Sequence, residues 1–122
     1  MNDGMKTNLT IEQSARLIEL GIDASIASCT IVTDEYNETT DNFEHPVFSL
    51  SDIISLLPKE IEAPDYWGEV DACNLGIAIY NDVWEAFYYD VNNAFRKAPE
   101  LIDALYELLC WVLANRPDEI KK

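Results

Sequence analysis

The chain has 122 residues, and its 23 Asp and Glu against 8 Lys and Arg give a formal net charge of -15 at pH 7. Between Leu17 and Phe95, sixteen carboxylates are accompanied by a single base, Lys59. Nucleic acids and anionic membranes both require a basic surface, so this balance argues against direct binding to either. The charge therefore constrains the partners of the protein, and it does not identify a reaction.

Size and composition predict a single globular domain. Hydrophobic residues make up 48% of the chain, which is more than an acidic disordered chain carries. We place the domain at residues 9–117, after a flexible N-terminal extension at 1–8 and before a C-terminal tail at 118–122. Met5 is an alternative translation start to Met1.

The sequence favours a cytoplasmic location. The first ten residues are polar and lack the apolar core of a signal peptide, and no apolar run approaches the ~20 residues that span a membrane. The cysteines are far apart and form no CxxC pair, so we expect reduced thiols that act as small buried hydrophobes. They are Cys29, Cys73 and Cys110.

The first helix has a clear start and end in the sequence. Thr10 is a candidate N-cap, and Gln13 follows it at capping-box spacing. Gly21 suits the left-handed position after the helix, and Ile22 would then pack back on Leu17. A helix is therefore predicted from residue 11 to residue 20.

A strand and an acidic segment follow. Residues 30–33 are β-branched at every position, which predicts a strand. Residues 34–44 contain five acids and no base, so we expect an exposed loop or a wide hairpin tip. These acids are a candidate acidic surface: Asp34, Glu35, Glu38, Asp41 and Glu44.

The second helix is also marked at both ends. Ser49 is the expected N-cap with Asp52 at N3, and Phe48 and Ile53 have the spacing of a hydrophobic staple. Pro58 ends the helix. Its predicted apolar stripe consists of Leu50, Ile53, Ile54 and Leu57.

Residues 66–90 have the composition of a sheet. The segments 75–80 and 83–89 flank Asn81-Asp82, a two-residue turn candidate that would pair Tyr80 with Val83. Residues 66–71 are a further candidate strand. One hairpin face is apolar and should meet the helices; it carries Leu75, Ile77, Ile79, Trp84, Ala86 and Tyr88. The other face is less polar than a solvated face usually is, so we expect partial cover; it carries Gly76, Ala78, Tyr80, Val83, Glu85 and Phe87.

The last helix has an apolar stripe over four turns, with Pro99 expected at N1 and Pro117 after its end. The opposite side turns apolar at Cys110, Trp111 and Ala114. A helix that is apolar all round is buried on all sides. Two interpretations stay open: these three residues contact a second subunit in a homodimer, or the sheet and another element enclose the helix.

The order of elements predicts an α+β fold, a short antiparallel β-meander packed on one face by three helices. The chain has four glycines, which cannot build a phosphate-binding loop, and a single histidine, His45, which cannot form a multi-histidine metal site. We therefore expect no catalytic residue, cofactor or metal. An enzyme that uses Glu44 and His45 as an acid–base pair is the least favoured alternative.

A second alternative is an acidic inhibitor that mimics DNA toward a host or phage DNA-binding protein. Spread over the ~6,700 Å² expected for a globule of this mass, the carboxylates are about threefold more dilute than the charges on a duplex. Mimicry therefore requires that the acids gather on one face.

Three stretches together resemble a known group of proteins. They are LTIEQS at 9–14 leading to LGI at 20–22, FSLSD at 48–52 leading to LPK at 57–59, and PELIDALYE at 99–107. Their order and spacing resemble small uncharacterised proteins of prophages and mobile elements in gut anaerobic bacteria. The resemblance implies a phage-derived accessory protein in a bacterial cytoplasm, and it supplies no functional residue.

The sequence therefore favours a non-enzymatic protein–protein interaction module, with an unknown protein partner and no cofactor.

Overall fold

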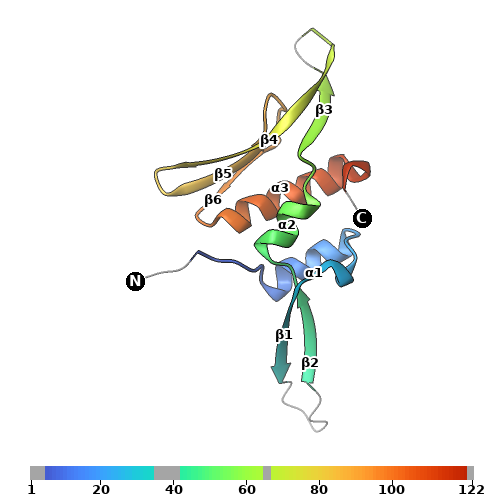
Figure 1. Ribbon diagram of the computed structural model, residues 1–122, viewed down its shortest axis with the longest axis vertical. Helices are drawn as coiled ribbons and strands as arrows, with labels where there is room; N and C mark the ends of the chain where they lie inside the picture. The colour runs from blue at the N-terminus through green and yellow to red at the C-terminus, as the bar shows by residue number, and fades with distance from the viewer. Residues whose placement is uncertain (1–4, 35–41, 65–66, 121–122) are drawn as a thin grey trace.

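The computed structural model describes residues 5–34, 42–64 and 67–120 (Figure 1). Within these ranges, three α-helices and two antiparallel sheets form an α+β fold, which confirms the predicted class. None of the helices in these ranges has the length and apolar character that crossing a bilayer requires. The elements are α1 (Ile11–Glu19), β1 (Cys29–Asp34), β2 (Asn42–Val47), α2 (Leu50–Leu56), β3 (Glu60–Pro64), β4 (Val70–Tyr80), β5 (Val83–Tyr88), β6 (Phe95–Ala98) and α3 (Leu101–Asn115), with short 3-10 turns at Ala24–Ile26 and Pro117–Glu119.

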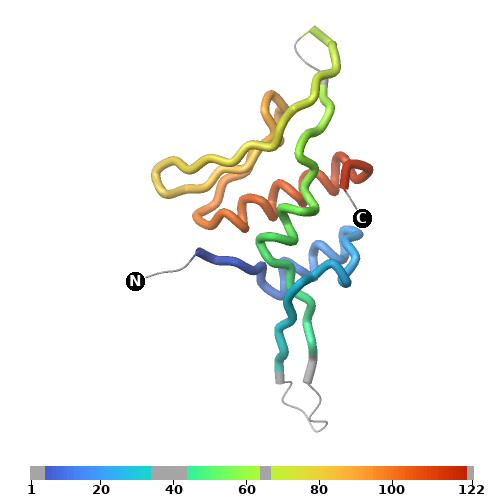
Figure 2. Tube along the Cα trace, viewed as in Figure 1, coloured from blue at the N-terminus to red at the C-terminus, as the bar shows by residue number. Residues whose placement is uncertain are grey.

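The four-stranded sheet has the order β3-β4-β5-β6, with every neighbouring pair antiparallel. β1 and β2 form a separate two-stranded sheet. These two sheets extend from the helical middle of the molecule in opposite directions (Figure 2). The helices lie between them, and this arrangement gives the molecule its elongated shape.

Helix α3 is the element on which the four-stranded sheet rests. It packs against β5 and β6 on one side and against α2 on another, whereas α1 packs against β2 (Figure 1). The buried residues of α3 are Leu101, Ile102, Ala104, Leu105, Leu108, Leu109, Val112 and Leu113. These side chains join the inner face of the sheet to the helices in one core.

The predicted ends of α1 are confirmed. Thr10 and Gln13 form the capping box, with Gln13 N donating to Thr10 Oγ1 at 3.0 Å and Thr10 N donating to Gln13 Oε1 at 2.9 Å. Gly21 has a φ of 114°, and Ile22 N donates to the carbonyl of Leu17 at 3.0 Å. Both features belong to a Schellman ending, which glycine allows at little steric cost.

The predicted N-cap of α2, Ser49, is also confirmed, and with Asp52 it forms a capping box whose contacts extend beyond the helix. Asp52 N donates to Ser49 Oγ at 3.1 Å, and Asp52 Oδ2 accepts from Ser49 N at 2.9 Å. The same oxygen accepts from the backbone N and the hydroxyl of Ser28, at 2.9 and 2.8 Å. The Asp52 carboxylate therefore ties the start of α2 to the chain that enters β1.

The hairpin register is confirmed in full. Tyr80 pairs with Val83 and Ile79 pairs with Trp84 around the turn Asn81-Asp82. The φ angles of Asn81 and Asp82 are 51° and 63°, the left-handed values that a type I′ turn requires.

The predicted inner face of that hairpin is covered only in part. Ala86 and Tyr88 of β5 are buried, and Trp84 is half-buried. On β4, Ile77 and Ile79 are 44% and 54% exposed. The alternation assigned these residues to the correct side, but α3 lies beneath β5 and β6 and leaves the turn end of β4 uncovered.

The sequence did not predict three of the strands. They are β2, β3 and β6. Each is held by antiparallel pairing with another strand: β2 with β1, β3 with β4, and β6 with β5. The candidate strand at 66–71 is wrong as a separate element, because Val70 and Asp71 begin β4 and residues 65–66 lie outside the described ranges.

Two helix details are corrected. Helix α3 begins at Leu101 with Glu100 as its N-cap, so Pro99 precedes the cap and does not occupy N1. The predicted apolar stripe of α2 included Ile54, but the side chain of Ile54 is 46% exposed. Leu56, which the predicted stripe did not include, is buried. The short α2 meets α3 through the face that carries Ile53 and Leu56, residues three apart on the helix.

The N-terminal segment is joined to the domain by several hydrogen bonds. Leu9 N donates to the carbonyl of Phe48, and Leu50 N donates to the carbonyl of Thr7. The ammonium of Lys6 lies 2.8 Å from Asp103 Oδ1 on α3. The chain before α1 therefore contacts the start of α2 and the first turn of α3.

Tyr88 connects the sheet to the end of α2. Its hydroxyl donates to the carbonyl of Pro58 at 2.7 Å, and the side chain is buried. Burial raises the pKa of Tyr88, so the hydroxyl keeps its proton and remains a donor.

Removal of the Tyr88 hydroxyl should destabilise the protein. In Tyr88→Phe the buried carbonyl of Pro58 loses its donor, and we expect the free energy of unfolding to fall by about 1 to 2 kcal/mol in urea titration. Tyr80→Phe is the matched control, since Tyr80 is 70% exposed and should change stability by less than about 0.5 kcal/mol. Equal effects of the two substitutions would contradict this role for Tyr88.

Asp52 should make stability depend on pH. Burial alone would raise the pKa of Asp52, but hydrogen bonds donated by Ser49 and Ser28 outweigh it and hold the pKa below its ordinary value. A depressed pKa in the folded state stabilises the fold above the unfolded pKa and loses that effect as pH falls through the folded pKa. The stability gap between wild type and Asp52→Asn, measured by urea titration, should therefore shrink as pH falls below the ordinary value of 3.8. A gap that stays constant from pH 7 to pH 3 would exclude the charged carboxylate as its source.

Candidate functional site

The outer face of the four-stranded sheet carries a cluster of aromatic side chains. Phe87 on β5 and Phe95 on β6 pair across the strands, and their rings stack with centroids 5.8 Å apart and planes inclined by 17°. Tyr89 meets Phe87 edge to face, with centroids 5.0 Å apart. We call these three side chains the aromatic cluster.

A glycine in the neighbouring strand sets the position of the cluster. Gly76 on β4 pairs with Phe87, and the Phe87 ring lies over the glycine backbone. A Cβ atom at this position would lie 2.8 Å from Phe87 Cζ and 2.9 Å from Tyr89 Cε2. Any side chain larger than hydrogen would therefore displace both rings.

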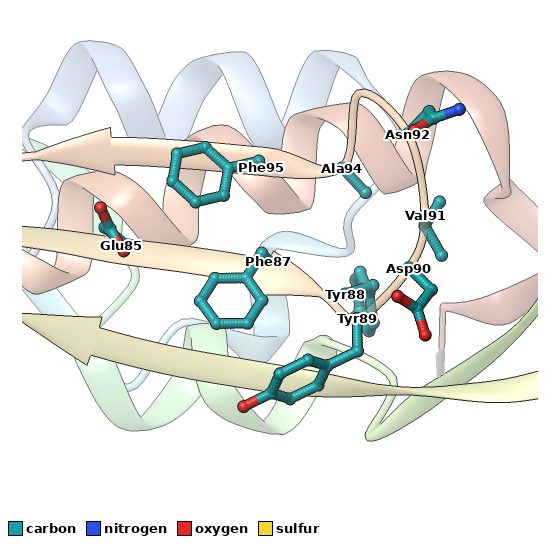
Figure 3. A pocket seen from close by; sticks show the side chains of 9 residues that line it. All are labelled: Glu85, Phe87, Tyr88, Tyr89, Asp90, Val91, Asn92, Ala94 and Phe95. Carbon is teal, nitrogen blue, oxygen red and sulfur yellow. The ribbon is translucent and has the colours of Figure 1, made fainter.

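The aromatic cluster is exposed to solvent. Tyr89 is 56% exposed and Phe95 is 46% exposed, while Phe87 is half-buried between them. In Figure 3 the three rings lie on one side of the strands, and the helices lie on the other. Of the residues predicted for this face, Gly76 is buried under the rings of Phe87 and Tyr89, whereas Tyr80 is 70% exposed. Side chains of the face itself therefore supply part of the expected cover.

A hollow of about 330 Å³ opens beside the rings. The aromatic cluster lines it together with Glu85, Asp90 and the turn that joins β5 to β6. Figure 3 shows Glu85 at one end of the row of rings and Asp90 at the other. The volume is at the lower limit of typical ligand pockets, and the hollow is open along its length.

Two smaller hollows continue from it along the same face. One, of about 280 Å³, lies between Tyr80, Val83, Glu85 and Lys97 and shares Glu85 with the first. The other, of about 160 Å³, lies beside β3 and β4 and shares Tyr89 and Asp90. We refer to the three together as the outer groove.

Two carboxylates of the outer groove, Glu85 and Asp90, are available to a ligand. Neither Glu85 nor Asp90 forms a hydrogen bond or an ion pair through its side chain with another described residue. Lys97 is paired with Glu85 in the strand register, but the two side chains do not meet as an ion pair.

The predicted partner-contact residues lie elsewhere, on α3. Cys110 and Trp111 are half-buried, and Ala114 is exposed. Burial raises the pKa of the Cys110 thiol. Of the three cysteines, which are all free, only Cys73 is fully buried, so the expectation of buried thiols holds for that residue alone.

Most of the predicted acidic surface lies outside the described residues. This applies to Glu35, Glu38 and Asp41, and the side chain of Asp34 is not described either. Glu44 on β2 is exposed. His45 lies beside it on the same strand and exchanges a hydrogen bond of 3.0 Å with the hydroxyl of Thr33, and it lines none of the three hollows of the outer groove.

Within the described ranges, no three Asp, Glu, His or Cys side chains converge as a metal site. The outer groove offers aromatic rings and carboxylates, which can bind a ligand by stacking and charge.

Sequence reasoning assigned Phe87 to the outer face but did not identify it as part of a site. Two parts of the structure were not predicted from the sequence. One is β6, which brings Phe95 beside Phe87, and the other is the turn after β5, which brings Tyr89 and Asp90 to the hollow. The signal that was available is the run Phe87-Tyr88-Tyr89, in which every second ring must point away from the core.

The chain was also compared with known proteins. A scan against protein-family models, a search of curated proteins and a search of solved structures found no match.

Proposed function

We propose that this protein is a non-enzymatic interaction module that binds a protein partner through the outer face of its four-stranded sheet. The observation that carries the proposal is the exposed aromatic cluster, Phe87, Tyr89 and Phe95. Antiparallel sheets with one solvated face usually carry polar residues there. Contiguous exposed apolar surface is typical of binding sites, and aromatic residues are enriched in them.

The distribution of charge favours this proposal over DNA mimicry. Exposed carboxylates lie on α1, β2, β3 and α3 and at the β4–β5 turn; examples are Glu12, Glu44, Glu62, Glu107 and Asp82. The accessible surface of 7901 Å² is also larger than the ~6,700 Å² expected of a compact globule, which dilutes the charge further. Mimicry would require a single dense face.

We further propose that the module acts in the bacterial cytoplasm as an accessory protein of a prophage or mobile element. The three free thiols suit a reducing compartment, and the origin rests on the sequence resemblance.

A homodimer through Cys110, Trp111 and Ala114 stays a prediction. In the structure α3 already has the sheet on one side and α2 on another, which supports the alternative that it is enclosed within one chain. Light scattering after size exclusion tests the dimer, and a monomer at high concentration would remove it.

The proposed function predicts that partner capture depends on the aromatic cluster. The immobilised protein should retain a specific partner from host lysate, and Tyr89→Thr with Phe95→Thr should abolish retention because the contact surface loses both rings. Both residues are exposed, so the thermal midpoint should change little.

The control makes the same change to Thr at two exposed apolar residues of another sheet. Ile31→Thr with Val32→Thr changes two exposed residues of β1, 39% and 54% exposed, and should leave capture intact. We call Tyr89→Thr with Phe95→Thr the cluster variant. The proposal is contradicted if the cluster variant still captures the partner. It is also contradicted if the control variant loses capture to the same extent.

A further inference from the structure

The outer groove runs beside β5 and continues past the end of that strand toward β3 and β4. Its hollows succeed one another from Tyr80 at the β4–β5 turn, past the aromatic cluster, to Asp71 and Asn74 on β4. Six-residue β5 alone has a length of about 20 Å at the rise of an extended chain. A shallow groove of this length suits an extended peptide segment of about six residues.

Carboxylates occur where the hollows join. Glu85 lines both the hollow near the turn and the central one, and Asp90 lines both the central one and the one beside β3. Because neither side chain is paired with another described residue, a cationic ligand would not have to displace an internal partner.

Aromatic rings and carboxylates together select the chemistry of the ligand. The face of an aromatic ring attracts a cation, and an adjacent carboxylate adds charge and hydrogen-bond acceptors. A guanidinium group can both stack on a ring and donate two parallel hydrogen bonds to a carboxylate, whereas an ammonium group cannot stack. The net charge of -15 also increases the encounter rate with basic partners.

We propose that the outer groove binds an extended, arginine-bearing segment of a basic partner protein, with guanidinium groups stacked on the aromatic cluster and bonded to Glu85 and Asp90. This inference rests on the proposed function and specifies the class of partner. The cation Lys97 lines only the hollow near the turn, so the segment's arginines are placed between Glu85 and Asp90.

The full chain, labelled with nitrogen-15, can be titrated with an eight-residue peptide in which Ser and Arg alternate. Amide shifts should centre on residues 74–97, which include most of the residues that line the outer groove. A peptide with citrulline in place of Arg keeps the shape and loses the charge, and it should bind at least about fivefold more weakly. A peptide with Lys in place of Arg should also bind more weakly, because it loses stacking and bidentate bonds.

Two charge variants distinguish binding at the outer groove from general electrostatic attraction to the acidic protein. Glu85→Gln with Asp90→Asn should weaken the Arg peptide about fivefold, since an exposed charge pair contributes a factor of about two to three. Asn suits position 90 because the φ of Asp90 is 62°. Glu12→Gln with Glu19→Gln removes the same charge from exposed positions on α1 and should change the affinity less than twofold.

The inference is overturned by any of three results: no shifts at millimolar Arg peptide, shifts centred outside residues 74–97, or equal weakening by the two charge variants. Equal binding of the Lys peptide overturns the assignment to arginine. The proposed function is tested separately, by the partner-capture experiment. If the cluster variant abolishes partner capture while the Arg peptide does not bind, the face binds a partner of other chemistry; if neither effect occurs, both proposals are wrong.

Discussion

The packing of α3 against the inner face of β5 and β6 is the constraint on which the rest of the structure depends. More than half of its fifteen residues are buried, and it contacts both the sheet and α2. A sheet this small is not stable unless one of its faces is covered. The helices lie on one side of the four-stranded sheet. The opposite face has no cover among the described elements, and its side chains remain available to a partner (Figure 1).

The parts of the fold that local chemistry determines could be predicted from the sequence. The two capping boxes depend on residues three apart, and the hairpin register follows from Asn81-Asp82, which tolerate left-handed φ angles. Strands β3 and β6 could not be predicted. Glu60–Pro64 and Phe95–Ala98 are short and carry charges or proline, and only pairing with β4 and β5 makes them strands.

The candidate site was harder to predict for a related reason. Alternation along β5 assigns Phe87 to the outer face, but it cannot show which residue of a distant strand lies beside it. Likewise the pattern assigned Ile77 and Ile79 to the helix side without showing where the helix ends. Sequence periodicity gives the direction of a side chain, and the extent of its cover is a tertiary property.

Gly76 has a consequence for how such a surface would behave in binding. Phe87 rests on the backbone of Gly76 and is held between Tyr89 and Phe95, so its ring has little rotational freedom left to lose. A surface that is already ordered gives up less conformational entropy on association than one built from long flexible side chains. Selectivity on this face would then be altered by changes beneath the rings as well as by changes to the rings themselves, and a single methyl group added to the β4 backbone would reshape it.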